Sequence, residues 1–409
     1  MIDQSNTLDS DGNGSLDSGG TLYIFDGNTF AGHAASKAIP EAIDLGGAIG
    51  NWIHAQTGSA PVRAHYVTFN ATSTHAIIAF VGSGHVLIAD ARTRKPVFVV
   101  DAGAQAHAAL PSPDDSYILV ANQNGKLVQR ISTNYKTNSF ALEAAATLDL
   151  AAGVTPSGAL KQAAGVRPDN APIVALPDAT STLALVTLRG GGAFVLNARS
   201  TPMTIVAEYT TATIEPSGLF GIRADNKFYF NSGDMGMGVM DHQSILYSLP
   251  VDAFSTTADL SPDTPAPHVV FDHGAMGNVD SHGMVLTKHD RYLWVADRLA
   301  NSAMVVDPSS DLVVNEVEMA GALSDDPTPD LFAISPSGSR VYVSLRGPNP
   351  LTGNNPDHHN AEGTTPGLGV IQVTHGGLAG KMSAVYRISN IDSAGIERAD
   401  PHAIAVRSR

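Results

Sequence analysis

The sequence contains no cysteine among its 409 residues, which excludes disulfide bonds, thiolate metal ligands and cysteine nucleophiles. It is poor in basic residues, with 24 Lys and Arg against 39 Asp and Glu, so nucleic acid and anionic membranes are not expected as partners. It also lacks any apolar run of about 18 residues, so we expect no membrane insertion. What remains is an acidic chain, whose net charge of −15 favours solubility and cationic ligands such as metal ions.

Short apolar runs separated by polar turns repeat along the chain. A clear example is 281–287, followed by the turn 288–290 and a second run at 291–297. Four such runs, which we term a, b, c and d, recur at spacings typical of propeller blades. Aromatic residues make up only 6% of the chain and no long amphipathic helical pattern is visible, which favours an all-β fold.

The two ends of the chain together complete one further repeat. His402–Val406 matches run a, and Thr21–Asp26 matches run c. Closing a ring in this way removes the sheet edges that a linear array would expose. We therefore predict a single domain over 1–409, an all-β seven-bladed β-propeller with four-stranded antiparallel blades, closed by the C-terminal strand joining the N-terminal blade. The predicted blades are 402–409 with 1–45, 64–101, 107–150, 170–209, 217–271, 282–318 and 330–388.

The chain starts within a repeat, because Met1–Gln4 reads as a run b. We therefore expect an exported protein, periplasmic or extracellular, whose signal peptide is absent from this sequence. Most of the long connections fall on one face of the predicted ring, the face at which the inner strands begin. Long loops on a rigid scaffold usually carry function, so we expect the functional site there.

One position in the repeat is rich in histidine. It lies five residues before the turn that ends run a, and holds His65, His107, Ala171, Gly218, His282, Asp330 and His402. Only 15 histidines occur in the chain, and each position of a repeat has a fixed direction, so four in one column are not accidental. Converging imidazoles and a carboxylate bind zinc or copper well. The alternative is that these histidines bond to neighbouring backbone or to water.

The column predicts a metal centre at the mouth of the propeller channel. Its predicted ligands are His65, His107, His282, Asp330 and His402, with Ala171 and Gly218 leaving a side open for a small molecule. Glu215 and Arg346 are the candidates for a catalytic role. Arg346 begins the long 346–366 loop and is expected to reach over the rim towards an anion.

An acidic loop near the N-terminus offers a second candidate cation site. Asp9, Asp11, Asn13 and Asp17 follow the first nine positions of an EF-hand-like calcium loop. Position twelve is Gly20 where a bidentate Glu is usual, and no helical pattern flanks the loop. Calcium binding there and a polar, turn-rich loop are the two interpretations.

The runs Tyr117–Asn122, Tyr292–Asp297 and Val341–Ser344 resemble the strand signature of YVTN-type bacterial propellers. The chain is further similar to the propeller copper enzymes nitrous oxide reductase and thiocyanate dehydrogenase, in which inner-strand histidines hold polynuclear copper. It departs from nitrous oxide reductase in having fewer column histidines and no dinuclear copper domain. This resemblance implies a copper-dependent oxidoreductase acting on a small molecule.

A second resemblance, to periplasmic zinc-chaperone propellers, implies a zinc carrier that does no chemistry. A third interpretation, which the fold alone allows, is a non-catalytic platform for protein interactions.

Overall fold

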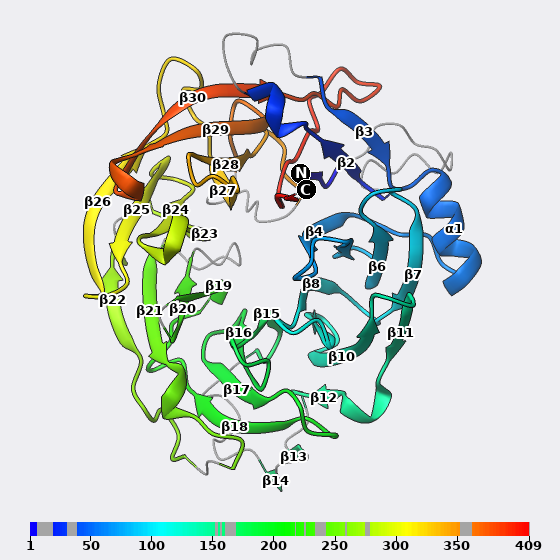
Figure 1. Cartoon of the computed structure of the whole chain (residues 1–409), viewed down its shortest axis with the longest axis vertical. Helices are drawn as coiled ribbons and strands as arrows, with labels where there is room; N and C mark the ends of the chain where they lie inside the picture. The colour runs from blue at the N-terminus through cyan, green and yellow to red at the C-terminus, as the bar shows by residue number, and fades with distance from the viewer. Residues whose placement is uncertain are drawn as a thin grey trace.

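The computed structural model describes residues 1–5, 19–30, 39–151, 154–155, 158–159, 169–216, 218–224, 226–233, 243–257, 260–274, 279–351 and 362–408. Their strands form seven antiparallel sheets set around a common axis and one separate two-stranded hairpin, with the two chain termini side by side near the centre (Figure 1). The predicted all-β seven-bladed propeller is confirmed. No helix within the described residues is long and apolar enough to cross a membrane.

The first three blades follow each other along the chain. Blade 1 contains β4 (Ala64–Phe69), β5 (His75–Phe80), β6 (His85–Asp90) and β7 (Pro96–Asp101). Blade 2 contains β8 (Ala106–Pro111), β9 (Tyr117–Asn122), β10 (Leu127–Asn134), β11 (Ser139–Leu142) and β12 (Leu148–Asp149). Blade 3 contains β15 (Pro172–Pro177), β16 (Leu183–Leu188), β17 (Ala193–Asn197) and β18 (Thr204–Tyr209).

Three further blades have the same order of strands. Blade 4 contains β19 (Gly218–Ala224), β20 (Lys227–Ser232), β21 (Ile245–Pro250) and β22 (His268–Asp272). Blade 5 contains β23 (Ser281–Leu286), β24 (Leu293–Asp297), β25 (Ser302–Asp307) and β26 (Leu312–Glu318). Blade 6 contains β27 (Pro329–Ile334), β28 (Arg340–Leu345), β29 (Gly367–Thr374) and β30 (Ala379–Arg387).

Blade 7 joins the two ends of the chain. It contains β1 (Ile2–Asp3), β2 (Thr21–Ile24) and β3 (Glu41–Asp44). The C-terminal segment pairs with β1 through an antiparallel bridge between Asp3 and Pro401, and the Ile2 N–H donates to the Ala403 carbonyl at 2.7 Å. The ring is therefore closed as predicted, although the C-terminal strand pairs only over its first residues.

A few elements lie outside the blades. They are α1 (Ala48–Thr57), the hairpin β13 (Val154–Thr155) with β14 (Gly158–Ala159), and the 3-10 turns Gly27–Phe30, Ala144–Ala146, Val251–Ala253, Lys288–Asp290 and His375–Gly377. Helix α1 was not expected from the sequence. It ends at Gly58, whose φ of 85° lies in the left-handed region that favours glycine.

The central strands of the blades form the core. All six residues of β5, β9 and β16 are buried, because neighbouring blades cover both faces of these strands. Trp294 of β24 is fully buried and donates its indole N–H to the Gly377 carbonyl. The scaffold that carries the channel mouth is therefore rigid.

The inner strands share one irregularity that matters for the site. In blades 1 to 6 the pairing register shifts at the start of the inner strand, as where Ala64 pairs with Phe80 and Tyr66 with Ala79, leaving His65 as the extra residue. His107 occupies the same bulge in blade 2. A β-bulge turns its extra side chain away from the regular alternation. The column residues are therefore placed by bulges at the end of the axis.

Two strand predictions were wrong. We expected the third run of blade 4 at 236–241; this range lies outside the described residues, and β21 pairs with β20 and β22 in that position. The run 236–241 holds two glycines and one β-branched residue, whereas Ile245–Leu249 is almost entirely apolar, as suits a strand buried on both faces. We expected the outer strand of blade 2 at 146–150; β12 lies in that range and pairs with β10, but β11 also pairs with β10, and a 3-10 turn separates the two.

Candidate metal centre

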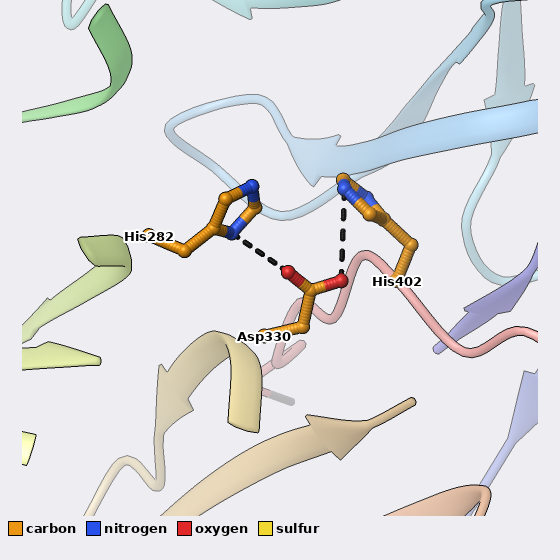
Figure 2. Close-up of side chains that lie close together, drawn as sticks. All are labelled: His282, Asp330 and His402. Atoms are coloured by element: carbon orange, nitrogen blue, oxygen red, sulfur yellow. Dashed lines mark ion pairs between the residues drawn. The ribbon is translucent and has the colours of Figure 1, made fainter. Parts of the chain in front are cut away.

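Four histidines and one aspartate from five blades converge where the inner strands begin. The rings of His65 and His402 stack with centroids 3.8 Å apart, and His107 meets His65 edge-on at 4.4 Å. His282 lies 5.6 Å from His402 between ring centroids. Asp330 lies between His282 and His402 (Figure 2). The five residues that share one position of the repeat thus lie together.

Three of the histidines are oriented by their Nδ1 atoms. Nδ1 lies 2.7 Å from the amide oxygen of Gln4 in His65, 3.0 Å from the Ile173 carbonyl in His107, and 3.0 Å from the His65 carbonyl in His402. A carbonyl oxygen accepts and cannot donate, so each Nδ1 carries the proton. Each Nε2 is then left with a lone pair. Histidines that bind metals are held in this way by a partner on the other ring nitrogen.

The Nε2 atoms of His65 and His107 lie 3.1 Å apart. Both carry lone pairs when the rings are neutral, so they repel each other unless a cation lies beside them. Two nitrogens bound tetrahedrally to one zinc ion at about 2.05 Å would lie about 3.3 Å apart. The spacing therefore fits two ligands of one ion.

His282 and Asp330 supply further donor atoms. His282 Nδ1 lies 2.7 Å from Asp330 Oδ1, but this contact lacks hydrogen-bond geometry, so both are buried polar atoms without a well-directed partner. His402 Nε2 lies 3.7 Å from Asp330 Oδ2. One ligand atom from each of His282, Asp330 and His402 lies within 4.8 Å of the others. This buried His/Asp group could bind a metal ion.

A buried ion pair network lies behind the histidines. Arg346 is fully buried, with Nη1 2.8 Å from Asp330 and Nε 2.6 Å from Asp400. Arg298 lies 3.8 Å from Asp330 and pairs with the buried Asp280. Each carboxylate oxygen of Asp330 therefore has one imidazole and one guanidinium nearby, Oδ1 with His282 and Arg298 and Oδ2 with His402 and Arg346, which fixes its orientation.

The buried histidines are neutral at ordinary pH. Burial lowers the pKa of His107 to about 4, with a smaller contribution from His282. Burial, with the neighbouring imidazoles, also holds the pKa of His65 well below its usual value. Burial alone would raise the pKa of Asp330, but His282, His402 and Arg346 hold it well below its usual range. The group therefore presents neutral imidazoles and a carboxylate, the protonation states that metal binding requires.

Access to the group is restricted. His65, His282, Asp330 and His402 are buried, and His107 is the one of the five that is partly exposed. The rings of Tyr66 of blade 1 and Phe220 of blade 4 have centroids 6.4 Å apart, so side chains from blades across the ring meet one another. His107 is the member of the group most accessible to solvent.

Comparison with known proteins supports the fold. No family model and no curated protein matches the sequence. Among solved structures the chain is similar to Kuenenia stuttgartiensis hydrazine synthase, at 12% identity over 76% of each chain and a TM-score of 0.54. It is also similar to the β-propeller domain of Cps50 (Swd1) from Myceliophteria thermophila, at 13% identity over 80% of this chain and 88% of that one, with a TM-score of 0.54. Such identities establish the propeller fold alone, so the resemblance to copper propellers stays a prediction.

The expected open side of the group needs correction. The register of the bulges and turns makes Ile173, not Ala171, the equivalent of His65 in blade 3, and Leu219, not Gly218, the equivalent in blade 4. Ala171 is fully buried, and a Cβ on Gly218 would lie 2.9 Å from Thr187. Ile173 is also buried. Blade 3 therefore contributes an apolar residue to the group, not a small one.

Of the two catalytic candidates, Arg346 lies elsewhere than predicted, whereas a role for Glu215 stays a prediction. Glu215 is exposed, its backbone bonds to Tyr247 and Ser232, and its pKa is raised by burial of the carboxyl and by Asp272. Arg346 does not reach over the rim, because two buried carboxylates hold it inside. The calcium candidates Asp9, Asp11, Asn13 and Asp17 lie outside the described residues.

Sequence reasoning missed the groups that orient the histidines. Gln4 comes from the N-terminal segment, and its amide N–H donates to Asp400 at 2.9 Å while its oxygen faces His65. Asp400 lies two residues before the column position His402. One sequence signal was available. Asp3, Gln4 and Asp400 are polar residues next to strand-like apolar runs, and strand pairing alone does not require polar residues there.

Proposed function

We propose that this propeller binds and holds one divalent transition-metal ion, zinc or copper, at the end of its axis. The Nε2 atoms of His65, His107 and His402 are the primary ligands, and the His282–Asp330 pair completes the site. The observation that carries the proposal is the pair of Nε2 lone pairs 3.1 Å apart, since both Nδ1 protons are committed to oxygen acceptors.

The surroundings favour holding the ion over using it in catalysis. Four of the five groups are buried and blade 3 adds the apolar Ile173, whereas catalytic sites keep a coordination position open. Neither catalytic candidate supports chemistry at the group. Arg346 is fully buried, and the contacts of Glu215 are with Tyr247 and Ser232.

A copper oxidoreductase acting on a small molecule is the second candidate. It is favoured by the five donor groups, which exceed the four that one tetrahedral ion takes. Bound copper would supply one-electron chemistry, and the partly exposed His107 marks the side from which a small molecule could approach.

Metal titration of the chelator-treated protein tests the proposal. We expect one tightly bound Zn²⁺ or Cu²⁺ per chain, measured by calorimetry with a competing chelator. His65→Ala, His107→Ala and His402→Ala should each weaken affinity by at least about 100-fold, because each removes a ligand with its orienting bond.

His75→Ala is the matched control. His75 is equally buried in blade 1, but its ring bonds to Thr74 and Asn138 at the other end of the blade, so affinity should not change. A protein that takes up neither metal, or equal loss in the control, would contradict the proposal. Copper-dependent turnover with an electron paramagnetic resonance signal would select the second candidate, and a colourless, exchangeable ion the first.

Gln4 should act as a positioning residue. Replacing it with leucine removes the acceptor on His65 Nδ1 and should weaken metal affinity by about 10–100-fold. Gln4→Met, which is similar in length and also lacks the acceptor, should weaken affinity to the same extent, whereas His75→Ala should not. Near-ultraviolet circular dichroism of the metal-free variants separates this effect from loss of the fold, and an unchanged affinity in Gln4→Leu would contradict the role.

A further inference from the structure

A second position of the repeat also carries polar side chains, at the same end of the ring as the histidines. It is the residue directly after the second strand of a blade, and its backbone N–H donates to the carbonyl two residues before the column position. In six blades this bond is described, and its donors are Gln4, Val81, Gln123, Arg189, Arg298 and Arg346. Because the same bond places all six, their side chains start from equivalent points around the axis.

The three arginines at this position have different partners. Arg346 is held between Asp330 and Asp400, as described above. Arg189 lies at the partly exposed rim, where Nε donates to Asp169 at 2.7 Å and Nη1 to Asn124 at 3.2 Å. These contacts account for the positions of both side chains.

Arg298 is only 3% exposed, but most of its donors have no acceptor. Its Nε donates to Asp280 at 2.5 Å, whereas Nη1 and Nη2 make no hydrogen bond to any residue that the structure describes. Nη1 lies 3.8 Å from Asp330 Oδ1, the oxygen that is 2.7 Å from His282 Nδ1. The unpaired edge of the guanidinium thus lies beside the histidine group. Buried donors normally find partners, so we expect an acceptor there that comes from solution.

The charges around the group favour an anion once a metal ion is bound. Asp280 and Asp400 balance the charges of Arg298 and Arg346. Asp330 then offsets one of the two charges of a divalent ion, so one positive charge remains. Without the ion, Asp330 leaves the same set of side chains with one negative charge, which repels an anion.

We propose that a small planar oxyanion, a carboxylate or bicarbonate, binds to the Nη1–Nη2 edge of Arg298 beside the metal ion, and that metal and anion bind cooperatively. Two donors at one edge of a guanidinium match two oxygens of such an anion in one plane. The inference rests on the proposed function, since the metal reverses the sign of the local charge. By linkage, the anion raises metal affinity by the same factor by which the metal raises anion affinity.

Titration of the chelator-treated full chain with Zn²⁺ in different salts provides the test. Affinity is measured by calorimetry with a competing chelator, at one pH and ionic strength. We expect it to be at least about tenfold higher in formate, acetate or bicarbonate than in perchlorate. Formate should also bind to the zinc-loaded protein and not to the metal-free protein. An effect of bicarbonate alone would assign the site to carbonate, and an effect of formate and acetate alone to carboxylates.

Two variants of Arg298 and one control locate the effect. Arg298→Lys keeps a positive charge near Asp280 and Asp330 but lacks the planar pair of donors, so the ratio of zinc affinities in formate and perchlorate should fall below about threefold. The double variant Arg298→Met with Asp280→Asn removes the whole ion pair and should bring the ratio to about one. Arg189→Met is the matched control, because the guanidinium of Arg189 bonds to Asp169 and Asn124, and it should keep the full ratio.

A ratio of about one in an unaltered protein that binds zinc would show that the free donors of Arg298 bond only to water, and would overturn the proposal. An unchanged ratio in both Arg298 variants would place the anion elsewhere and also overturn it. So would an equal effect of sulfate, which is tetrahedral. A protein that binds zinc in none of these salts would overturn the metal centre itself, so the two failures are distinguishable.

Discussion

Replacing Arg346 with methionine is expected to lower the free energy of unfolding by about 3–5 kcal/mol. Arg346 is the shared partner of Asp330 and Asp400, and all three side chains are fully buried. Without the guanidinium two buried carboxylates lose their closest cation, and only Arg298, 3.8 Å from Asp330, remains to offset their charge, which costs far more than the lost contacts alone. Denaturant unfolding of the metal-free protein, monitored by tryptophan fluorescence, measures the effect.

The control restores the charge balance. A triple variant with Arg346→Met, Asp330→Asn and Asp400→Asn removes the stranded charges and should recover most of the lost stability, since the desolvation penalty of the ions also disappears. A loss below about 1 kcal/mol in Arg346→Met would show that the two carboxylates reach water, and the assigned burial of the network would be wrong.

Removal of the metal is expected to destabilise the protein by about 4 kcal/mol, relative to free metal at a thousand times its Kd. His65, His107, His282 and His402 belong to blades 1, 2, 5 and 7, so the proposed ion would tie blades from across the ring. Unfolding therefore has to release it. Differential scanning calorimetry with and without chelator, at fixed ionic strength, provides the measurement.

The ligand variant His402→Ala is the control for metal removal. With affinity about 100-fold weaker, the same free metal concentration is about ten times its Kd, so the effect of chelator should shrink from about 4 to about 1.4 kcal/mol, whereas in His75→Ala it should be as large as in the unaltered protein. A chelator effect of the same size in His402→Ala would mean that the metal binds elsewhere, and the assigned ligands would be wrong.

The fold could be predicted from the sequence because each blade repeats a local pattern. The closure of the ring was predicted from two matches, that of His402–Val406 to a first strand and that of Thr21–Asp26 to a third. The convergence of His65, His107, His282, Asp330 and His402 followed from the same regularity, since equivalent positions of a repeat point the same way. Whether these residues bind metal is a prediction that the experiments above address.

Features that depend on packing between distant segments could not be predicted. From the sequence, Arg346 was interpreted as the first residue of a surface loop. Its position between Asp330 and Asp400 depends on the closure of the ring. The bond from Gln4 to His65 joins residues from different blades. In blade 3 the proline-rich stretch before the strand obscured the register, so that Ala171 took the place of Ile173.

Because the residues that face the axis lie in β-bulges at the start of the inner strands, they can change without changing the pairing of the sheets. An extra residue in a bulge has no partner across the ladder, so exchanging it leaves the pairing of the blade intact. Ile173 and Leu219 hold this place in blades 3 and 4, and a histidine at either needs no change in strand length or turn. Evolution or a protein engineer can thus vary the number and kind of donors one blade at a time, and similar rings can differ completely in what they hold.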